Sequence, residues 1–144
     1  MDEAQLRLAA ILGVETDEVS FGPSTTQNTY VLANAFANWL KNGDSIIVTN
    51  QDHEANTGPW RRLADRGITV LEWRLNEDTG HLDINDLQKL LDDRVKLVCF
   101  PHCSNVVGEI NDVSKIVSLI HSSGAFACVD GVSYAPHGLS LIHI

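Results

Sequence analysis

Short apolar runs rich in β-branched residues alternate along this chain with longer segments in which apolar residues recur every three or four positions. The clearest run is SIIVT at residues 45–49, whose centre, Ile46, Ile47 and Val48, is apolar throughout. Continuous runs of this kind suit strands that are buried on both faces of a parallel sheet. We therefore predict an α/β fold of three layers, with a mostly parallel sheet and helices on both of its faces.

The same pattern gives a range for each expected element. Between residues 25 and 40, for example, Tyr30, Phe36 and Leu40 belong to an apolar series with helical spacing. Asp83 is expected to cap the helix that follows it. The expected helices are 4–12, 25–40, 55–66, 84–91 and 112–122, and the expected strands are 19–21, 45–49, 68–73, 96–100 and 125–130.

Length and composition limit the classes of protein to consider. A chain of 144 residues that is 44% hydrophobic can bury one ordinary core, so one domain is expected. Its formal charge of −9, with no basic stripe to offset it, argues against a nucleic acid or an anionic membrane as a partner. No apolar run approaches the roughly 20 residues of a membrane-spanning helix. The acidic N-terminus also lacks the basic start of a signal peptide.

The three cysteines, Cys99, Cys103 and Cys128, lack the spacing of metal ligands, so no metal site is expected. Cys99 and Cys128 lie inside apolar runs, where a free cysteine behaves as a small buried hydrophobe. Free thiols are typical of a reducing compartment. We therefore expect a cytoplasmic location.

The end of the chain has an unusual sequence. The hexapeptide LSLIHI at residues 139–144 is what the DNA sequence CTG TCT CTT ATA CAC ATC encodes, and that sequence is the transposon end used in common sequencing libraries. We interpret residues 139–144 as a non-native tail, the alternative being an ordinary apolar strand. Residues 1–138 would then form part of a domain that is interrupted after its last strand, because no helix follows to cover that face.

Polar residues follow the expected strands at the edge where parallel sheets bind ligands. The turn GPSTT at residues 22–26 opens a long helix, whose free N–H groups and positive dipole end suit a phosphate. The hydroxyls of Ser24, Thr25 and Thr26 would add donors. The alternative is that these residues only cap the helix, as serine and threonine commonly do.

Three further loops each contribute one side chain of useful chemistry. His53 can stack on a flat aromatic ligand, although a single loop histidine is more often plain surface. Asn105 offers a donor and an acceptor to an oxygen substituent, or simply makes a turn. Asp130 ends a buried strand and needs a partner such as a protonated ring nitrogen, unless it caps the next turn. A phosphate cradle, a stacking ring, an amide and a carboxylate are together the parts that hold pyridoxal phosphate.

The order of these motifs resembles the cofactor domain of the class V aminotransferases. The matching blocks are STT at 24–26, DHEAN at 52–56, HCSNVVG at 102–108 and VDG at 129–131. Within that family the chain is most similar to the cysteine desulfurases, and through YAPHG at 134–138 to the cysteine desulfurase-like branch. The resemblance runs from about residue 6 to residue 138 and implies part of the large domain that binds pyridoxal phosphate.

The resemblance also implies a role for each matching position. Thr26, with its neighbour Thr25, would bind the cofactor phosphate. His53 would stack on the pyridine ring, and Asn105 would hydrogen-bond the phenolic oxygen. Asp130 would pair with the protonated ring nitrogen, which lets the ring accept electrons from a substrate carbanion.

The chain departs from the family pattern in several respects. Ser133, near the implied place of the phenolic oxygen, stands where desulfurases have a glutamine and relatives a histidine, so the resemblance does not establish desulfuration. The family's Schiff-base lysine lies well downstream of the VDG block, and the last lysine here is Lys115. The family's C-terminal domain, with the substrate-binding arginine and the desulfurase nucleophile, has no counterpart, and Cys103 does not match that nucleophile. We expect no catalytic residue in this chain and no activity from it alone.

Two functions follow as expectations. The resemblance implies a parent enzyme that uses pyridoxal phosphate on a small amino acid, either removing sulfur from cysteine or transferring an amino group, and that forms a homodimer. The alternative is a non-catalytic α/β module that binds a phosphorylated metabolite or a nucleotide. Neither a GxGxxG nor a GxxxxGK loop occurs in the sequence, which argues against the alternative.

Overall fold

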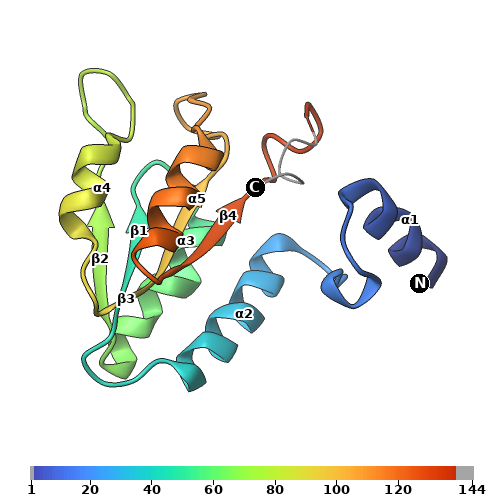
Figure 1. Ribbon diagram of the computed structural model, residues 1–144, viewed down its shortest axis with the longest axis horizontal. Coiled ribbons are helices and arrows are strands. Elements are labelled where there is room, and N and C mark those ends of the chain that lie inside the picture. The colour runs from blue at the N-terminus through green and yellow to red at the C-terminus, as the bar shows by residue number, and fades with distance from the viewer. Residues whose placement is uncertain (1, 139–144) are drawn as a thin grey trace.

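The computed structural model describes residues 2–138 and contains one sheet with helices around it (Figure 1). The sheet has four parallel strands in the order β2-β1-β3-β4, namely β1 (Ser45–Thr49), β2 (Thr69–Trp73), β3 (Val95–Pro101) and β4 (Phe126–Asp130). The helices are α1 (Asp2–Leu12), α2 (Thr25–Trp39), α3 (Glu54–Arg61), α4 (Ile84–Leu90) and α5 (Val113–Ser122), with 3-10 turns η1 (Thr16–Glu18) and η2 (Arg62–Arg66). No helix within residues 2–138 is long and apolar enough to cross a membrane.

Helices cover both faces of the sheet (Figure 1). On one face α4 and α5 pack over residues that include Ile47 and Phe100. On the other face α2, α3 and η2 pack over Ile46, Val48 and Leu97. Successive residues of β1 point into different cores, which is why this strand has no polar side. The predicted three-layer α/β fold is confirmed.

Two of the predicted elements differ from the structure by more than two residues. Residues 19–21 do not form the predicted strand, because they pair with none of the strands within residues 2–138 and only Val19 of this segment is buried. The predicted helix 55–66 is α-helical only to Arg61 and continues as the 3-10 turn η2. A tight last turn is common at helix ends, and Gly67, with φ of 82°, stops the helix in the left-handed conformation. The interpretation of residues 139–144 as a tail concerns positions outside the described residues.

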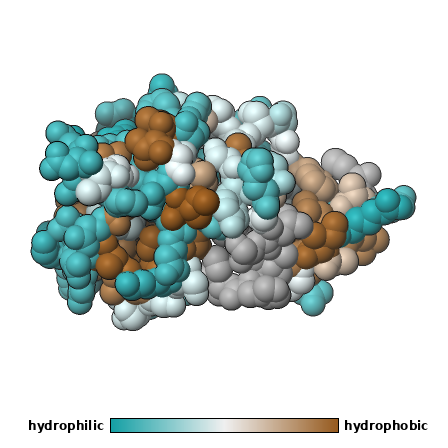
Figure 2. Space-filling view, turned by 90° about the horizontal axis from the view of Figure 1, so that it is seen from above, coloured by the Kyte–Doolittle hydropathy of each residue, from teal (hydrophilic) through white to brown (hydrophobic). Residues whose placement is uncertain are grey.

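Several large apolar side chains remain on the surface. On the outer side of α2, Leu32 is 41% exposed and Trp39 is 51% exposed, and Phe126 at the start of β4 is 53% exposed. In α1, Leu6 and Ile11 are also more than half exposed. Figure 2 shows hydrophobic residues gathered toward the end of the molecule that carries α1, and separate hydrophobic groups among hydrophilic residues elsewhere on that face. Apolar surface of this kind favours association.

We expect the isolated 144-residue chain to self-associate, because β4 is an open edge of the sheet within the described residues and Trp39 and Phe126 lie exposed beside each other, with ring centroids 5.6 Å apart. Light scattering after gel filtration should show a mass that rises with protein concentration. Leu32→Gln should lower this association, whereas Lys89→Gln on α4 should not. A monodisperse monomer across the concentration series would contradict the expectation.

Candidate functional site

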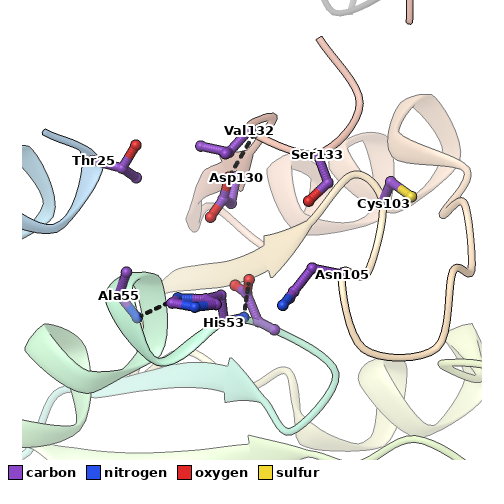
Figure 3. Close-up of a pocket in the computed structure, with 9 residues that line it drawn as sticks. Thr25, His53, Ala55, Cys103, Asn105, Asp130, Val132 and Ser133 are labelled. Carbon is purple, nitrogen blue, oxygen red and sulfur yellow. Dashed lines mark hydrogen bonds between the residues drawn. The ribbon is translucent and has the colours of Figure 1, made fainter. Parts of the chain in front are cut away.

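A cavity of about 260 Å³ opens at the edge of the sheet where the parallel strands end. Figure 3 shows His53 and Asn105 on one side of it and Asp130 and Ser133 on the other. Its lining residues are Thr25, Asp52, His53, Ala55, Cys103, Asn105, Asp130, Val132 and Ser133. The structure therefore brings together Thr25, His53, Asn105, Asp130 and Ser133 of the sequence-predicted site, whereas Ser24 and Thr26 do not line this cavity.

His53 is held by the helix that follows it. It is the N-cap of α3, and its Nδ1 atom accepts a hydrogen bond from the backbone N–H of Ala55 at 2.9 Å. In the neutral ring, Nε2 therefore carries the proton. The same contact orients the ring while leaving the residue exposed at the cavity. His53 is thus more than plain surface, because it caps a helix and lines the cavity.

Asp52 is a lining residue that sequence analysis did not select. Its carboxylate accepts a hydrogen bond from the backbone N–H of His53 at 2.7 Å and another from the side-chain amide of Asn56, which is buried. The pKa of Asp52 is raised from 3.8 to about 6, mainly because the carboxyl group is buried and also because the carboxylate of Asp130 is near, although the two hydrogen bonds act in the opposite direction. The available sequence signal was the DHEAN block at residues 52–56, which places Asp52 just before the helix that carries Asn56.

The raised pKa of Asp52 predicts how stability depends on pH. Between pH 3.8 and about 6 the folded protein binds more protons at this group than the unfolded chain does, so the free energy of unfolding should fall as the pH rises through this window. Asp52→Asn should remove this slope and make the protein more stable above pH 6, by on the order of 2 kcal/mol. Urea unfolding of the full-length protein at a series of pH values measures the effect. The exposed Asp86→Asn on α4 is the control, and an unchanged slope in Asp52→Asn would refute the assignment.

Asp130 ends β4 and presents a carboxylate to the cavity. Its Oδ1 atom accepts a hydrogen bond from the backbone N–H of Val132 at 2.8 Å, so it does cap the following turn. Its backbone carbonyl accepts from the N–H of His102 at 2.8 Å, which ties the ends of β3 and β4 together. Within residues 2–138 no hydrogen bond is made to Oδ2 of Asp130. That oxygen is available to a ligand.

The first turn of α2 has free donors beside the cavity. Ser24 is the N-cap, and its hydroxyl accepts from the N–H of Gln27 at 3.2 Å while its carbonyl accepts from the N–H of Asn28 at 2.9 Å. The N–H groups of Thr25 and Thr26 precede these and make no hydrogen bond within the described part of the chain, as is usual for a helix start. The Ser24 hydroxyl therefore caps the helix as an acceptor, and the free backbone N–H groups of this turn belong to Thr25 and Thr26.

Asn105 lies in a turn that is closed by its neighbour Ser104. The carbonyl of Ser104 accepts from the N–H of Gly108 at 2.9 Å, and Gly108 has a φ of 74°, a conformation that favours glycine. The turn leaves Asn105 exposed at the cavity. Cys103 and Ser133 line the same cavity. No group of three or more histidine, cysteine or acidic side chains within residues 2–138 is arranged to hold a metal ion.

Comparison with known proteins gives a consistent set of relatives. A family model of the class V aminotransferases matches residues 1–140. The aminotransferase-like protein FGM3 of Gibberella zeae is 39% identical over 139 residues, which are 94% of this chain and 34% of the relative. A cysteine desulfurase of Yersinia pseudotuberculosis is 36% identical over 129 residues, which are 88% of this chain and 32% of the relative. The chain spans about a third of the length of these relatives.

Solved structures show the same fold. The crystal structure of the cysteine desulfurase CsdA from Escherichia coli superposes with a TM-score of 0.87 at 28% identity, covering 94% of this chain and 35% of that one. A cysteine desulfurase from Thermococcus onnurineus gives a TM-score of 0.79 at 28% identity, covering 88% of this chain and 32% of that one. Because the family model matches residues 1–140 and the fold is that of cysteine desulfurases, this chain belongs to the class V aminotransferase family.

Proposed function

We propose that this chain forms the cofactor-binding part of a longer enzyme that uses pyridoxal phosphate to act on a small amino acid. The cavity at the carboxyl edge of the sheet carries this proposal. It gathers the ring of His53, the amide of Asn105 and the carboxylate of Asp130 beside the start of α2. These groups come from separate loops, and only the folded sheet brings them to one place.

The chemistry of these residues fits the cofactor. Pyridoxal phosphate combines a flat pyridine ring, a phenolic oxygen and a phosphate. Oδ2 of Asp130, which has no hydrogen-bond donor within residues 2–138, suits a protonated ring nitrogen. The free N–H groups at the start of α2 suit the phosphate because the positive end of the helix dipole faces it. Asn105 can donate to the phenolic oxygen.

Each residue has a distinct task in the proposed site. Thr25 and Thr26 bind the phosphate and anchor the cofactor. His53 stacks on the ring and orients it, since its own orientation is set by the bond to Ala55. Asp130 holds a proton on the ring nitrogen. When bound in this way, the cofactor supplies an electron sink for negative charge that develops on the substrate carbon.

The reaction proposed for the full-length enzyme is the removal of sulfur from cysteine or the transfer of an amino group. No lysine lines the cavity in the described part of the chain, which supports our inference that residues 1–144 alone are inactive. The proposal also includes a homodimer, as the family resemblance implies. A cytoplasmic location is supported by three cysteines that all remain free of disulfides.

The test is to purify the full-length protein encoded by the gene and to record its visible absorbance before and after removal and re-addition of pyridoxal phosphate. Incubation with L-cysteine or L-alanine then shows whether sulfide is released or an amino group is transferred. We expect saturable cofactor uptake and turnover of one of these amino acids. Failure to take up the cofactor, together with saturable binding of a nucleotide or a phosphorylated metabolite, would favour the non-catalytic binding module instead.

A further inference from the structure

Gln51 is a polar side chain buried without any exposed surface at the end of β1. Both ends of its amide are used. Its Nε2 atom donates to the carbonyl of Gly80 at 2.7 Å, and its Oε1 atom accepts from the side-chain amide of Asn111 at 2.8 Å. A buried amide is unfavourable unless it is hydrogen-bonded, and here these contacts engage both ends.

These bonds extend into a network, defined here as the Gln51 frame, that consists of Gln51, Ser104 and Asn111. The hydroxyl of Ser104, which is 1% exposed, donates to the backbone carbonyl of Gln51 at 2.6 Å. Asn111, which is 7% exposed, also donates to the carbonyl of Pro101 at 2.8 Å. The frame therefore joins the loops that leave β1 and β3, and through Gly80 it reaches the loop that follows β2.

The Gln51 frame adjoins three residues of the cavity along the chain. Asp52 and His53 follow Gln51, and Asn105 follows Ser104. The hydrogen bond from the Ser104 hydroxyl to the backbone carbonyl of Gln51 links the two loops that present His53 and Asn105. A change in the frame must therefore alter how these two side chains lie relative to each other.

We propose that Gln51 is a positioning residue, which through its contacts with Asn111 and Gly80 sets the placement of His53 relative to Asn105 and so determines how tightly the cavity holds its ligand. This inference rests on the proposed function for the identity of that ligand, pyridoxal phosphate. Glutamine is required because the site needs a donor and an acceptor on one side chain. Glutamate cannot donate to Gly80, and methionine of similar length satisfies neither partner.

The experiment uses the full-length protein and a double-mutant cycle between Gln51 and His53, with pyridoxal phosphate affinity and the rate of cofactor loss as readouts. Gln51→Met should weaken binding roughly tenfold when His53 is present, but less than about twofold in the His53→Ala background. If Gln51 served stability alone, Gln51→Met would weaken cofactor binding by the same factor in the wild-type and His53→Ala proteins. Ile120→Val, a buried substitution on α5 away from the frame, is the control and should leave cofactor affinity unchanged.

Two further measurements keep the inference testable. If Gln51→Met does not fold, Ser104→Ala removes one bond of the frame and should weaken binding in the same direction by a smaller factor. If the wild-type protein binds no pyridoxal phosphate, the proposed function fails, and the frame is tested by the imidazole proton resonances of His53 in the cofactor-free protein. Those resonances should shift in Gln51→Met and not in Ile120→Val. Equal factors in the two backgrounds, or unshifted His53 resonances, would overturn the inference.

Discussion

Asp130→Asn should lower the turnover of an amino-acid substrate by roughly 100- to 1,000-fold in the full-length protein, with the cofactor still bound. Asparagine keeps the size of the side chain and can still accept the hydrogen bond from Val132. It removes the negative charge that holds a proton on the ring nitrogen, and with it the stabilisation of charge that develops during the reaction. Turnover with cysteine and with alanine is measured together with the cofactor absorbance, which confirms occupancy.

The control for this substitution is Asp86→Asn, which removes an exposed carboxylate on α4 and should leave turnover unchanged. His53→Ala should have a smaller effect on turnover than Asp130→Asn, and it should also weaken cofactor retention, because stacking acts on the bound ring before any chemistry. Turnover close to that of the wild type in a fully loaded Asp130→Asn variant would exclude Asp130 from the proposed site.

Trp73→Ala should lower the free energy of unfolding by about 3–5 kcal/mol. Trp73 is fully buried at the end of β2, packs edge-on against Phe100 with ring centroids 6.3 Å apart, and donates from Nε1 to the carbonyl of Asp83 at 2.9 Å. Alanine would leave a large cavity in the core beneath α4 and α5 and would remove the hydrogen bond from Nε1 to the carbonyl of Asp83. The midpoint of urea unfolding, followed by circular dichroism, measures the loss.

The chain offers a matched control in Trp39, which is 51% exposed on α2. The same change there, Trp39→Ala, should cost less than about 1 kcal/mol because little buried volume is lost. The loss of unfolding free energy in Trp73→Phe should lie between the losses in Trp73→Ala and Trp39→Ala, because phenylalanine keeps most of the packing but not the hydrogen bond. Equal losses from Trp73→Ala and Trp39→Ala would contradict the placement of Trp73 in the core.

Local signals in the sequence were enough to predict much of this fold. The strand at residues 45–49 has the bounds observed for β1, and Asp83 caps α4 as expected, accepting from the N–H of Asn85 at 2.8 Å. The bounds of this strand and the helix cap could be predicted because each is set by residues that are close together in the sequence. The gathering of His53, Asn105 and Asp130 was also predictable, because parallel strands bring their carboxyl ends to one edge.

Features that depend on distant residues were not predictable in this way. Residues 19–21 have the composition of a strand, but a strand needs a neighbour to bond with, and none of the described strands lies beside them. The Gln51 frame was missed because Gln51 and Asn111 are 60 positions apart and nothing in the local sequence marks their contact. Asp52 was missed because its burial, which raises its pKa, arises only in the folded chain.

The placement of β1 beside β3, with β2 at the outside, has a consequence for the order in which the molecule folds. Ser104 and Gln51 meet across a separation of 53 positions, so a long loop must close before the cavity can exist. Such non-local pairing is slow compared with helix formation. During synthesis, His53 leaves the ribosome well before Asn105 and Asp130 do. The nascent chain therefore cannot assemble the ligand cavity until β4 has emerged and joined the sheet.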